Sequence, residues 1–346
     1  MGKTRIGLDV GSTAVRAAEV AGGSDRPSLV RAAQVPLPAG AVENGEIRDP
    51  RAVADALKEL WRKGGFRGKQ VYMGVGNQRV VVREVILPWL PEKELMESLP
   101  YQVQEFIPIP VEEAVLDFDI LEEFEHEGGK MLRVLLVAAQ RPMVETVVEV
   151  AHQARLEPVG LDLIPFALLR SVGEVDGAVF DQQGEEAVVD VGAEITSICI
   201  HDHGVPRFVR ILPTGGGDIT TAVSRALGVP MEEAEALKTG QGPEGHASAE
   251  DARRVSHGRA SSFVDEIRSS LEFYSAQTPG ARVTRVLVTG GGSKLEGFTE
   301  LLEERLAIPV ERGRPLEKVE PGTDVADETE ALLAVAIGLA IPGGAR

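Results

Sequence analysis

One short pattern occurs twice in the chain, and this repeat constrains the fold more than any other feature. Residues 5–20 (RIGLDVGSTAVRAAEV) consist of an apolar run, a turn of small residues and a second apolar run, which is typical of a β-hairpin. Residues 186–200 (EAVVDVGAEITSICI) repeat this plan. The Asp-Val-Gly of Asp9–Gly11 recurs at Asp190–Gly192, 181 residues later in a chain of 346. The sequence therefore predicts an ancient duplication of one α/β unit.

Helical patterns follow each hairpin. Residues 50–63 (PRAVADALKELWRK) come after the first and residues 218–227 (DITTAVSRAL) after the second. A further strand, turn and helix is expected at residues 286–306. Strands that alternate with helices indicate two α/β domains, and 346 residues are enough for two or three compact units.

Two segments interrupt the repeated plan. Residues 78–158 mix strand-like and helical pieces and are expected to form a small α+β insertion. Residues 231–279 are helical at both ends, with a Gly/Pro/Ser-containing stretch at 239–248 that we expect to be a mobile loop. The expected division is a first domain at 1–77, 159–182 and 328–346, the insertion at 78–158, a second domain at 183–230 and 280–327, and a helical insertion at 231–279.

The formal net charge of −18 disfavours nucleic acid as a partner. Much of this charge lies in residues 92–127, which hold twelve acidic residues and one basic residue, Lys93. Two interpretations remain open: solvated acidic helix faces, or a surface that meets a basic partner.

The single cysteine, Cys199, excludes an internal disulfide and fits a reducing compartment. The longest apolar run, residues 331–341, is shorter than the ~20 residues that span a bilayer. We therefore expect a cytoplasmic protein without direct membrane insertion.

The two hairpin turns suggest phosphate chemistry. Backbone N–H groups in a turn of small residues can bind phosphate oxygens, and a carboxylate that ends the preceding strand can hold Mg²⁺ through water. Two more glycine-rich turns, at 213–218 and 289–293, each precede a helical pattern, where the helix N-terminus favours anionic groups. Any one of these turns alone is more often a plain hairpin or βα turn. Together they predict a nucleotide clamped between two domains.

The order and spacing of these segments resemble the actin-like ATPase superfamily over nearly the whole chain. Residues 9–16 resemble the first phosphate loop, 190–196 the second, and 289–298 the adenosine loop. Residues 161–172 and 330–339 resemble the two connecting helices. The resemblance implies an actin-like ATPase fold, with two related α/β domains around a nucleotide cleft and a small α+β insertion in the first domain.

The resemblance also implies ATP or ADP with Mg²⁺ as cofactors, and it assigns roles to individual residues. Asp9 and Asp190 would hold the metal. Phosphate contacts, mainly through backbone amides, are implied for Gly11, Ser12, Thr13, Arg16, Gly192, Ala193, Glu194 and Thr196. Contacts near the phosphates or sugar are implied for Gly215, Gly216 and Gly217, and contacts with ribose or adenine for Glu235, Lys238, Gly290, Gly291, Gly292, Ser293 and Lys294. A solvated i,i+3 pair is the alternative for Glu235 and Lys238.

One position departs from the pattern of the superfamily. Ile164 stands just before Pro165, where many relatives carry a carboxylate that orients the attacking water. Isoleucine cannot accept a proton, and Asp162 is the nearest, doubtful substitute for a catalytic base. The expected activity is ATP binding with slow or no hydrolysis.

Within the superfamily, the segments LPWLPEKEL (87–95), EFIP (105–108) and VLDFD (115–119) resemble the PilM family of type IV pilus assembly proteins. This resemblance implies a scaffold in a pilus, secretion or competence machine at the inner face of the membrane. The insertion would bind the N-terminal tail of a PilN-like membrane protein, with pilus motor ATPases and self-association as further possible contacts. Two alternatives stay open: a sugar or metabolite kinase, and an FtsA-like filament-forming protein.

Overall fold

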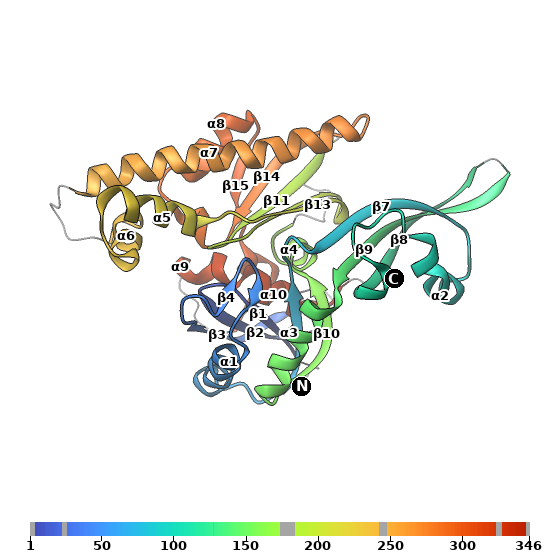
Figure 1. Cartoon of the computed structure of the whole chain (residues 1–346), viewed down its shortest axis with the longest axis horizontal. Helices are drawn as coiled ribbons and strands as arrows, with labels where there is room; N and C mark the ends of the chain where they lie inside the picture. The colour runs from blue at the N-terminus through green and yellow to red at the C-terminus, as the bar shows by residue number, and fades with distance from the viewer. Residues whose placement is uncertain are drawn as a thin grey trace.

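In the computed structural model, the described residues are 4–22, 26–126, 128–173, 184–241, 248–322 and 327–343. They form two lobes, each built on its own sheet, and an arm that extends to one side of them (Figure 1). The expected boundary near residue 182 and most of the expected loop at 239–248 lie outside the described residues.

The first lobe is built on a six-stranded sheet. Its strands, in spatial order, are β10 (Glu157–Leu163), β6 (Gln70–Val75), β1 (Thr4–Val10), β2 (Ala14–Ala21), β3 (Ser28–Pro36) and β16 (Glu320–Pro321). β1, β2 and β3 are antiparallel neighbours, whereas β6 and β10 run parallel to β1. The alternating apolar residues of β1 and β2, such as Leu8 and Val15, pack against α1 (Pro50–Gly64) in one core.

The second lobe repeats this arrangement. Its strands, in spatial order, are β13 (Val205–Leu212), β12 (Thr196–Asp202), β11 (Glu185–Val191), β14 (Val283–Thr289) and β15 (Val310–Arg312). β11, β12 and β13 form an antiparallel meander, and β14 and β15 continue parallel to β11. Each lobe therefore starts with a hairpin strand that pairs on its other side with a parallel strand, which confirms the prediction of two related α/β units.

Helices of the second lobe cover its sheet and extend to one end. They are α5 (Gly216–Leu227), α6 (Met231–Lys238), α7 (Ser248–Gln277) and α8 (Phe298–Leu306). α7 contributes Phe263, Val264 and Ile267 to the core of the second sheet. The predicted helices at both ends of residues 231–279 are thus α6 and α7.

Two helices lie between the lobes, α4 (Ile164–Val172) and α10 (Ala334–Ala340). The sequence resemblance began the first of them at Leu161, and this boundary was wrong because residues 157–163 form strand β10, which pairs with β6. α4 and α10 cross closely: a Cβ atom built on Gly338 would lie 1.9 Å from the carbonyl oxygen of Ala167.

The arm comprises the strands β7 (Val80–Pro88), β9 (Gly129–Gln140) and β8 (Ala114–His126), which form one antiparallel sheet in that order, and α2 (Glu92–Gln102). Leu95 and Leu99 of α2 are fully buried in the core of the arm. The next helix, α3 (Arg141–Gln153), instead contributes Val150 and Ala151 to the core of the first lobe.

Short elements complete the described chain. They are β4 (Val42–Glu43), β5 (Glu46–Ile47), η1 (Val111–Glu113), η2 (Gly291–Lys294), η3 (Pro315–Lys318), α9 (Asp327–Glu330) and η4 (Ala331–Leu333). No helix within the described ranges is both long enough and apolar enough to cross a membrane.

Candidate functional site

Two aspartates, the buried Asp9 of the first lobe and the partly buried Asp190 of the second, lie at the centre of the candidate site. Asp9 is the second-last residue of β1 and stands opposite Arg16 of β2, whose Nη1 lies 3.4 Å from Asp9 Oδ2. Burial raises the pKa of Asp9, and Arg16 partly offsets this effect. Burial, and then the negative charge of Asp9, raise the pKa of Asp190 to about 7. The two carboxylates therefore lie close enough to repel each other across the two lobes.

This pair fits a divalent cation. Two buried carboxylates of like charge destabilise each other, and a cation between them removes that repulsion. Mg²⁺ usually takes one or two carboxylates from a protein and completes its shell with water and substrate phosphates. Among the described residues, no cluster of three or more His, Cys, Asp or Glu side chains could form a metal cage. Asp9 and Asp190 supply the donor set expected for a water-mediated Mg²⁺ site.

The two predicted phosphate loops share one backbone geometry. The amide of Gly11 donates to the carbonyl of Ala14 over 3.1 Å, and the amide of Gly192 donates to the carbonyl of Ile195 over 2.9 Å. Each loop is thus a tight turn closed three residues after its glycine. Ser12 and Thr13 lie in the first turn, and Ala193 and Glu194 in the second.

The first turn of α5 packs directly on the second phosphate loop. The amides of Gly216 and Gly217 donate to the carbonyls of Gly192 and Ala193, over 2.9 and 2.7 Å. A Cβ atom on Gly215 would lie 2.5 Å from the carbonyl oxygen of Gly192. Gly215 and Gly217 are needed because a Cβ atom at either position would lie less than 3 Å from a backbone oxygen of the loop, and the amides of Gly216 and Gly217 hold the loop in place.

The hydroxyl of Thr196 has a similar supporting role. It is buried and donates to the carbonyl of Thr214 over 2.8 Å, so it ties the end of the second phosphate loop to the segment that leads into α5.

The predicted adenosine loop reaches the same place. A Cβ atom built on Gly216 would lie 3.5 Å from the Cα atom of Gly292, and one built on Gly292 would lie 2.3 Å from Val191 Cγ1. Ser293 is buried and donates its hydroxyl to the carbonyl of Gly290 over 2.7 Å, which closes the turn between β14 and η2. Gly291 and Lys294 belong to η2. The structure therefore brings together three loops that are far apart in sequence.

Glu235 and Lys238 join this group from α6. Lys238 Nζ lies 2.7 Å from Glu235 Oε2 and donates to the carbonyl of Gly216 over 3.2 Å and to the Thr220 hydroxyl over 2.9 Å. The side chain of Lys238 is only 10% exposed. Lys238 is therefore packed against the N-terminal turn of α5, whereas the side chain of Glu235 is 52% exposed.

Asp162 lies at a different place from this cluster. Its carboxylate forms an ion pair with Arg170 and accepts from the amide of Leu163 over 2.7 Å, and it lines a cavity next to the arm. Ile164 packs on the end of β6, where a Cβ atom built on Gly74 would lie 2.8 Å from its Cγ1 atom. Position 164 is thus occupied by a packed aliphatic side chain.

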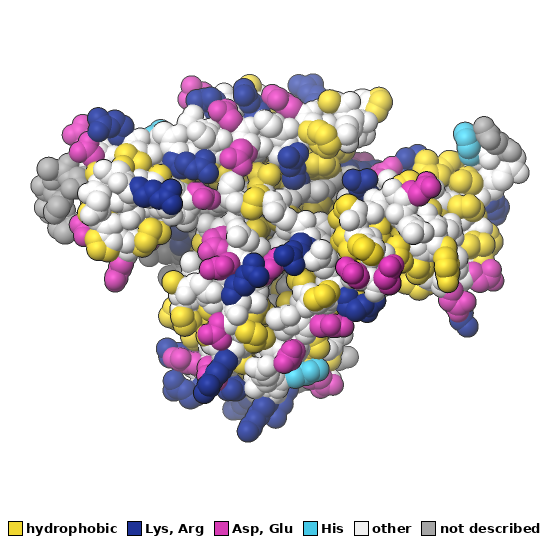
Figure 2. All heavy atoms as spheres, in the orientation of Figure 1, with side chains coloured by type: hydrophobic (Ala, Val, Ile, Leu, Met, Phe, Trp, Pro, Cys, Tyr) yellow, Lys and Arg dark blue, Asp and Glu magenta, His cyan; other side chains and the backbone are white. Residues whose placement is uncertain are grey.

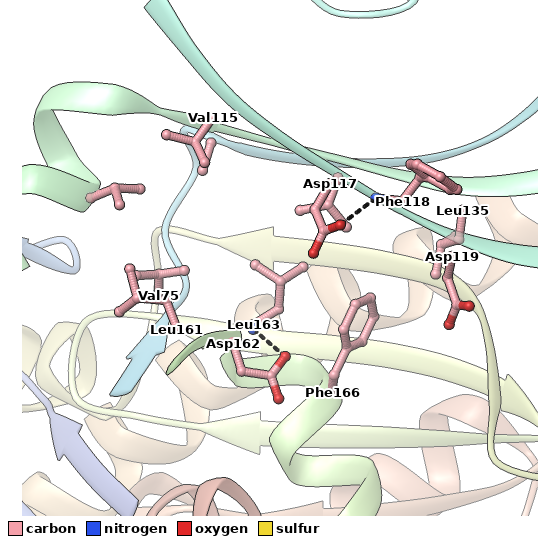
Figure 3. A pocket seen from close by; sticks show the side chains of 13 residues that line it. Val75, Val115, Asp117, Phe118, Asp119, Leu135, Leu161, Asp162, Leu163 and Phe166 are labelled. Atoms are coloured by element: carbon pink, nitrogen blue, oxygen red, sulfur yellow. Dashed lines mark hydrogen bonds between the residues drawn. The ribbon is translucent and has the colours of Figure 1, made fainter. Parts of the chain in front are cut away.

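A groove between the arm and the first lobe was not identified from the sequence. Its inner part is a cavity of about 200 Å³ with mainly apolar walls and three carboxylates (Figure 3). The apolar walls include Val75, Val115, Leu135, Leu161, Leu163 and Phe166, and the carboxylates belong to Asp117, Asp119 and Asp162. A wider hollow of about 630 Å³ shares Phe118, Asp119, Asp162 and Phe166 and continues to residues 204–206 of the second lobe.

The alternating pattern of residues 115–119 (VLDFD) is the local signal for this groove. It places Val115, Asp117 and Asp119 on one face of β8. The facing wall comes from β10 and α4, and no local pattern in the sequence reveals that contact.

Comparisons with known proteins agree with this fold. A solved structure described as a PilM–PilN type IV pilus biogenesis complex contains a chain that is 32% identical, with 97% of both chains covered and a TM-score of 0.81. The ethanolamine utilization protein EutJ from Carboxydothermus hydrogenoformans is 18% identical over 98% of this chain and 90% of its own, with a TM-score of 0.57, and supports the fold alone.

Among curated proteins, the chain is similar to the cell division protein FtsA. The Pseudomonas aeruginosa protein is 26% identical over 37% of this chain and 35% of its own length. The Bacillus subtilis protein is 21% identical over 90% of this chain and 78% of its own. The first of these alignments spans about a third of the curated relative. The family model described as "Type IV pilus assembly protein PilM" matches residues 7–343. The chain therefore belongs to the PilM family of type IV pilus assembly proteins.

Proposed function

We propose that this protein is a cytoplasmic ATP-binding scaffold of a type IV pilus, or of a related secretion or competence machine. ATP or ADP would lie between the two lobes with Mg²⁺, and the partner would be the N-terminal tail of a PilN-like inner-membrane protein. The observation that carries the nucleotide part is the pair of aspartates from the two lobes, Asp9 and Asp190, because the raised pKa of Asp190 reflects a charge arrangement that a cation stabilises.

The residues around this pair support a nucleotide rather than a bare cation. The two phosphate loops would face the phosphates, with Arg16 next to Asp9 as a further positive charge. Glu235 and Lys238, packed beside Gly216, would contact the ribose or the adenine, with η2 on the other side. Nucleotide bound by both lobes would stabilise their closed arrangement.

Slow or absent hydrolysis follows from the same arrangement. Ile164 supplies no proton acceptor, and the carboxylate of Asp162 is engaged by Arg170 in the groove beside the arm. We therefore assign no catalytic residue. The nucleotide would act mainly as a structural ligand between the lobes.

The groove between arm and first lobe is the proposed site for the partner tail. Its apolar walls suit aliphatic side chains, and its three carboxylates suit Lys or Arg. Cytoplasmic segments next to transmembrane helices are rich in Lys and Arg. β10 is the edge strand of its sheet, so an extended tail could also pair with its backbone. Such a partner would hold the protein at the inner face of the membrane.

Two calorimetric titrations test the two parts of this proposal. The first adds ATP with and without Mg²⁺ to the wild-type protein and to Asp190→Asn. We expect Mg²⁺-dependent binding that is at least tenfold weaker in the variant. The second adds a synthetic PilN-like tail to the wild type and to Asp119→Asn. No heat with any tail sequence, with or without Mg-ATP, would count against the scaffold.

Two alternatives are less well supported. A sugar or metabolite kinase needs a general base near a substrate hydroxyl, and Asp162, the nearest carboxylate to position 164 in the sequence, lies in the groove, paired with Arg170. If the protein formed FtsA-like filaments, its light scattering would increase after ATP is added, and a light-scattering assay would measure this increase. Contacts with pilus motor ATPases and self-association remain predictions for pull-down and sedimentation experiments.

A further inference from the structure

A hydrogen bond connects the two lobes at the second phosphate loop. The backbone amide of Asn44, in the first lobe, donates to Oε2 of Glu194, in the second lobe, over 2.6 Å. The two residues are 150 positions apart in the sequence. The resemblance to known families implied phosphate contacts for Glu194 mainly through its backbone amide, and it assigned no role to the contact of its side chain with the other lobe.

The first lobe holds Asn44 in a rigid turn. Asn44 and Gly45 have φ values of 51° and 74° and connect β4 to β5, which is typical of the two-residue turn of a tight hairpin. A Cβ atom on Gly45 would lie 3.0 Å from Asn77 Cβ, so the turn rests on the buried Asn77. Glu46, which follows the turn, also forms an ion pair with Arg79, and 2.8 Å separate Glu46 Oε1 from Arg79 Nε.

The second lobe holds Glu194 equally firmly. Glu194 lies inside the turn that the amide of Gly192 closes by its bond to Ile195. The carbonyls of Gly192 and Ala193 also accept from the first amides of α5. A movement of the Glu194 backbone would therefore move the second phosphate loop and the start of α5 together.

We propose that Glu194 is a positioning residue that closes the two lobes over a bound nucleotide. This proposal rests on the proposed nucleotide site. A carboxylate that accepts from a backbone amide forms a charge-assisted hydrogen bond, which is stronger than a neutral one. The lobes cannot separate at the phosphate loops without breaking it. The bond therefore slows the escape of nucleotide and has little effect on its entry into the open protein.

Three variants test this role. Glu194→Ala removes the acceptor, and Glu194→Gln keeps the length of the side chain and an acceptor oxygen but removes the charge. Glu304→Ala is the matched control, because Glu304 is an exposed glutamate on α8 in the same lobe. Circular dichroism and a thermal melt first establish that each variant is folded.

The first measurement uses nucleotide-free protein. Hydrogen–deuterium exchange, read by mass spectrometry on a peptide that covers residues 42–47, reports the amide of Asn44. We expect one amide to exchange about tenfold faster in Glu194→Ala, at an intermediate rate in Glu194→Gln, and at the wild-type rate in Glu304→Ala. If the exchange rate were unchanged in both Glu194 variants, the hydrogen bond between the Asn44 amide and Glu194 would not exist in solution.

The second measurement is stopped-flow dissociation of a fluorescent ADP. We expect its dissociation rate to rise about tenfold in Glu194→Ala and less in Glu194→Gln, with association rates within about twofold of wild type. Normal binding with an unchanged dissociation rate in Glu194→Ala would overturn the positioning role alone. A wild-type protein that binds no ADP would overturn the proposed nucleotide function, whereas the exchange experiment would still decide whether the contact between the lobes exists.

Discussion

Arg170 forms an ion pair with Asp162, and the two residues line the same hollow between the arm, the first lobe and the second lobe. Arg170 Nε also donates to the carbonyl of Gly338 over 2.9 Å, which links this hollow to α10. A carboxylate paired in this way is a poor general base for a nucleotide in the cleft, because its charge is already balanced by the guanidinium group.

The first prediction concerns Asp162. Asp162→Asn should leave any ATP turnover within about twofold of wild type, because this carboxylate lies in the groove. The same variant should weaken the binding of a basic PilN-like tail by about fivefold to tenfold, since Arg170 loses its partner and its positive charge then repels Lys or Arg in the hollow. Single-turnover kinetics and calorimetry measure the two effects on one preparation. A loss of turnover with unchanged binding of the tail would show that Asp162 acts in hydrolysis and not in recognition of the tail.

The second prediction concerns pH and Asp190. Its pKa is about 7 in the folded protein, compared with an ordinary value of 3.8, so between these values the folded state keeps a proton that the unfolded chain has lost. The stability of the ligand-free protein should therefore fall as pH rises from about 4 to 7, and Asp190→Asn should show a smaller fall. Thermal melts of the wild type and of Asp190→Asn between pH 4 and pH 7 measure the two decreases in stability.

Metal binding should show the opposite trend. Mg²⁺ needs the ionised carboxylate, so Mg-ADP should raise the melting temperature more at pH 8 than at pH 5.5. An equal effect of Mg-ADP at both values would argue against Asp190 as the group that faces the metal.

The third prediction concerns alanine substitutions at two helical glycines, Gly216 in α5 and Gly258 in α7. A Cβ atom on Gly216 would make an ordinary 3.5 Å contact with Gly292, so Gly216→Ala should fold but fill space between the loops that face the nucleotide. We expect a loss of nucleotide affinity of about tenfold. Gly258→Ala, in α7, meets no atom within 4 Å and should stabilise the fold by about 0.5–1 kcal/mol without changing affinity. Calorimetry and thermal melts of both variants distinguish these effects.

The fourth prediction concerns the acidic segment at residues 92–127. Figure 2 shows Asp and Glu side chains among hydrophobic ones on the arm. Reversal of Glu122 and Glu123 is the direct test suggested by the sequence, but Glu122 pairs with Arg133 over 3.1 Å and its loss would disturb the arm sheet. Glu113→Lys with Glu123→Lys avoids this pair, because both residues are exposed.

The double variant should slow association with a basic tail by about threefold to tenfold at low salt and flatten the salt dependence of the rate. Glu303→Lys with Glu304→Lys on α8 changes the net charge equally in a remote place and is the control. If both double variants slow association to the same extent, only the overall charge matters.

The sequence predicted the parts of the fold that repeat or are local. The match between Asp9 and Asp190 identified both hairpins, and the structure places each aspartate at the same point of its sheet. Helix α1 was predicted within one residue, because Asp49 caps its start with a bond to the amide of Ala52 and Gly65 ends it.

Contacts between distant segments could not be predicted in the same way. The bond from Asn44 to Glu194 joins two turns whose residues carry no shared pattern, and the groove beside Asp162 has walls from the arm and from α4. The start of α4 was misplaced because the residues before it are apolar at alternate positions, as in a strand, yet they also fit the periodicity of a short helix. Backbone pairing with β6 makes these residues a strand and not the first turn of the helix.

The crossing of α4 and α10 at Gly338 also has an evolutionary consequence. Any side chain larger than hydrogen at this position would push the carbonyl of Ala167 away and force the two helices apart. Surface loops and insertions can change without this effect, but a substitution at Gly338 would change the angle between the two helices that lie between the lobes. Gly338 should therefore be among the last residues to vary in any descendant that keeps a working cleft.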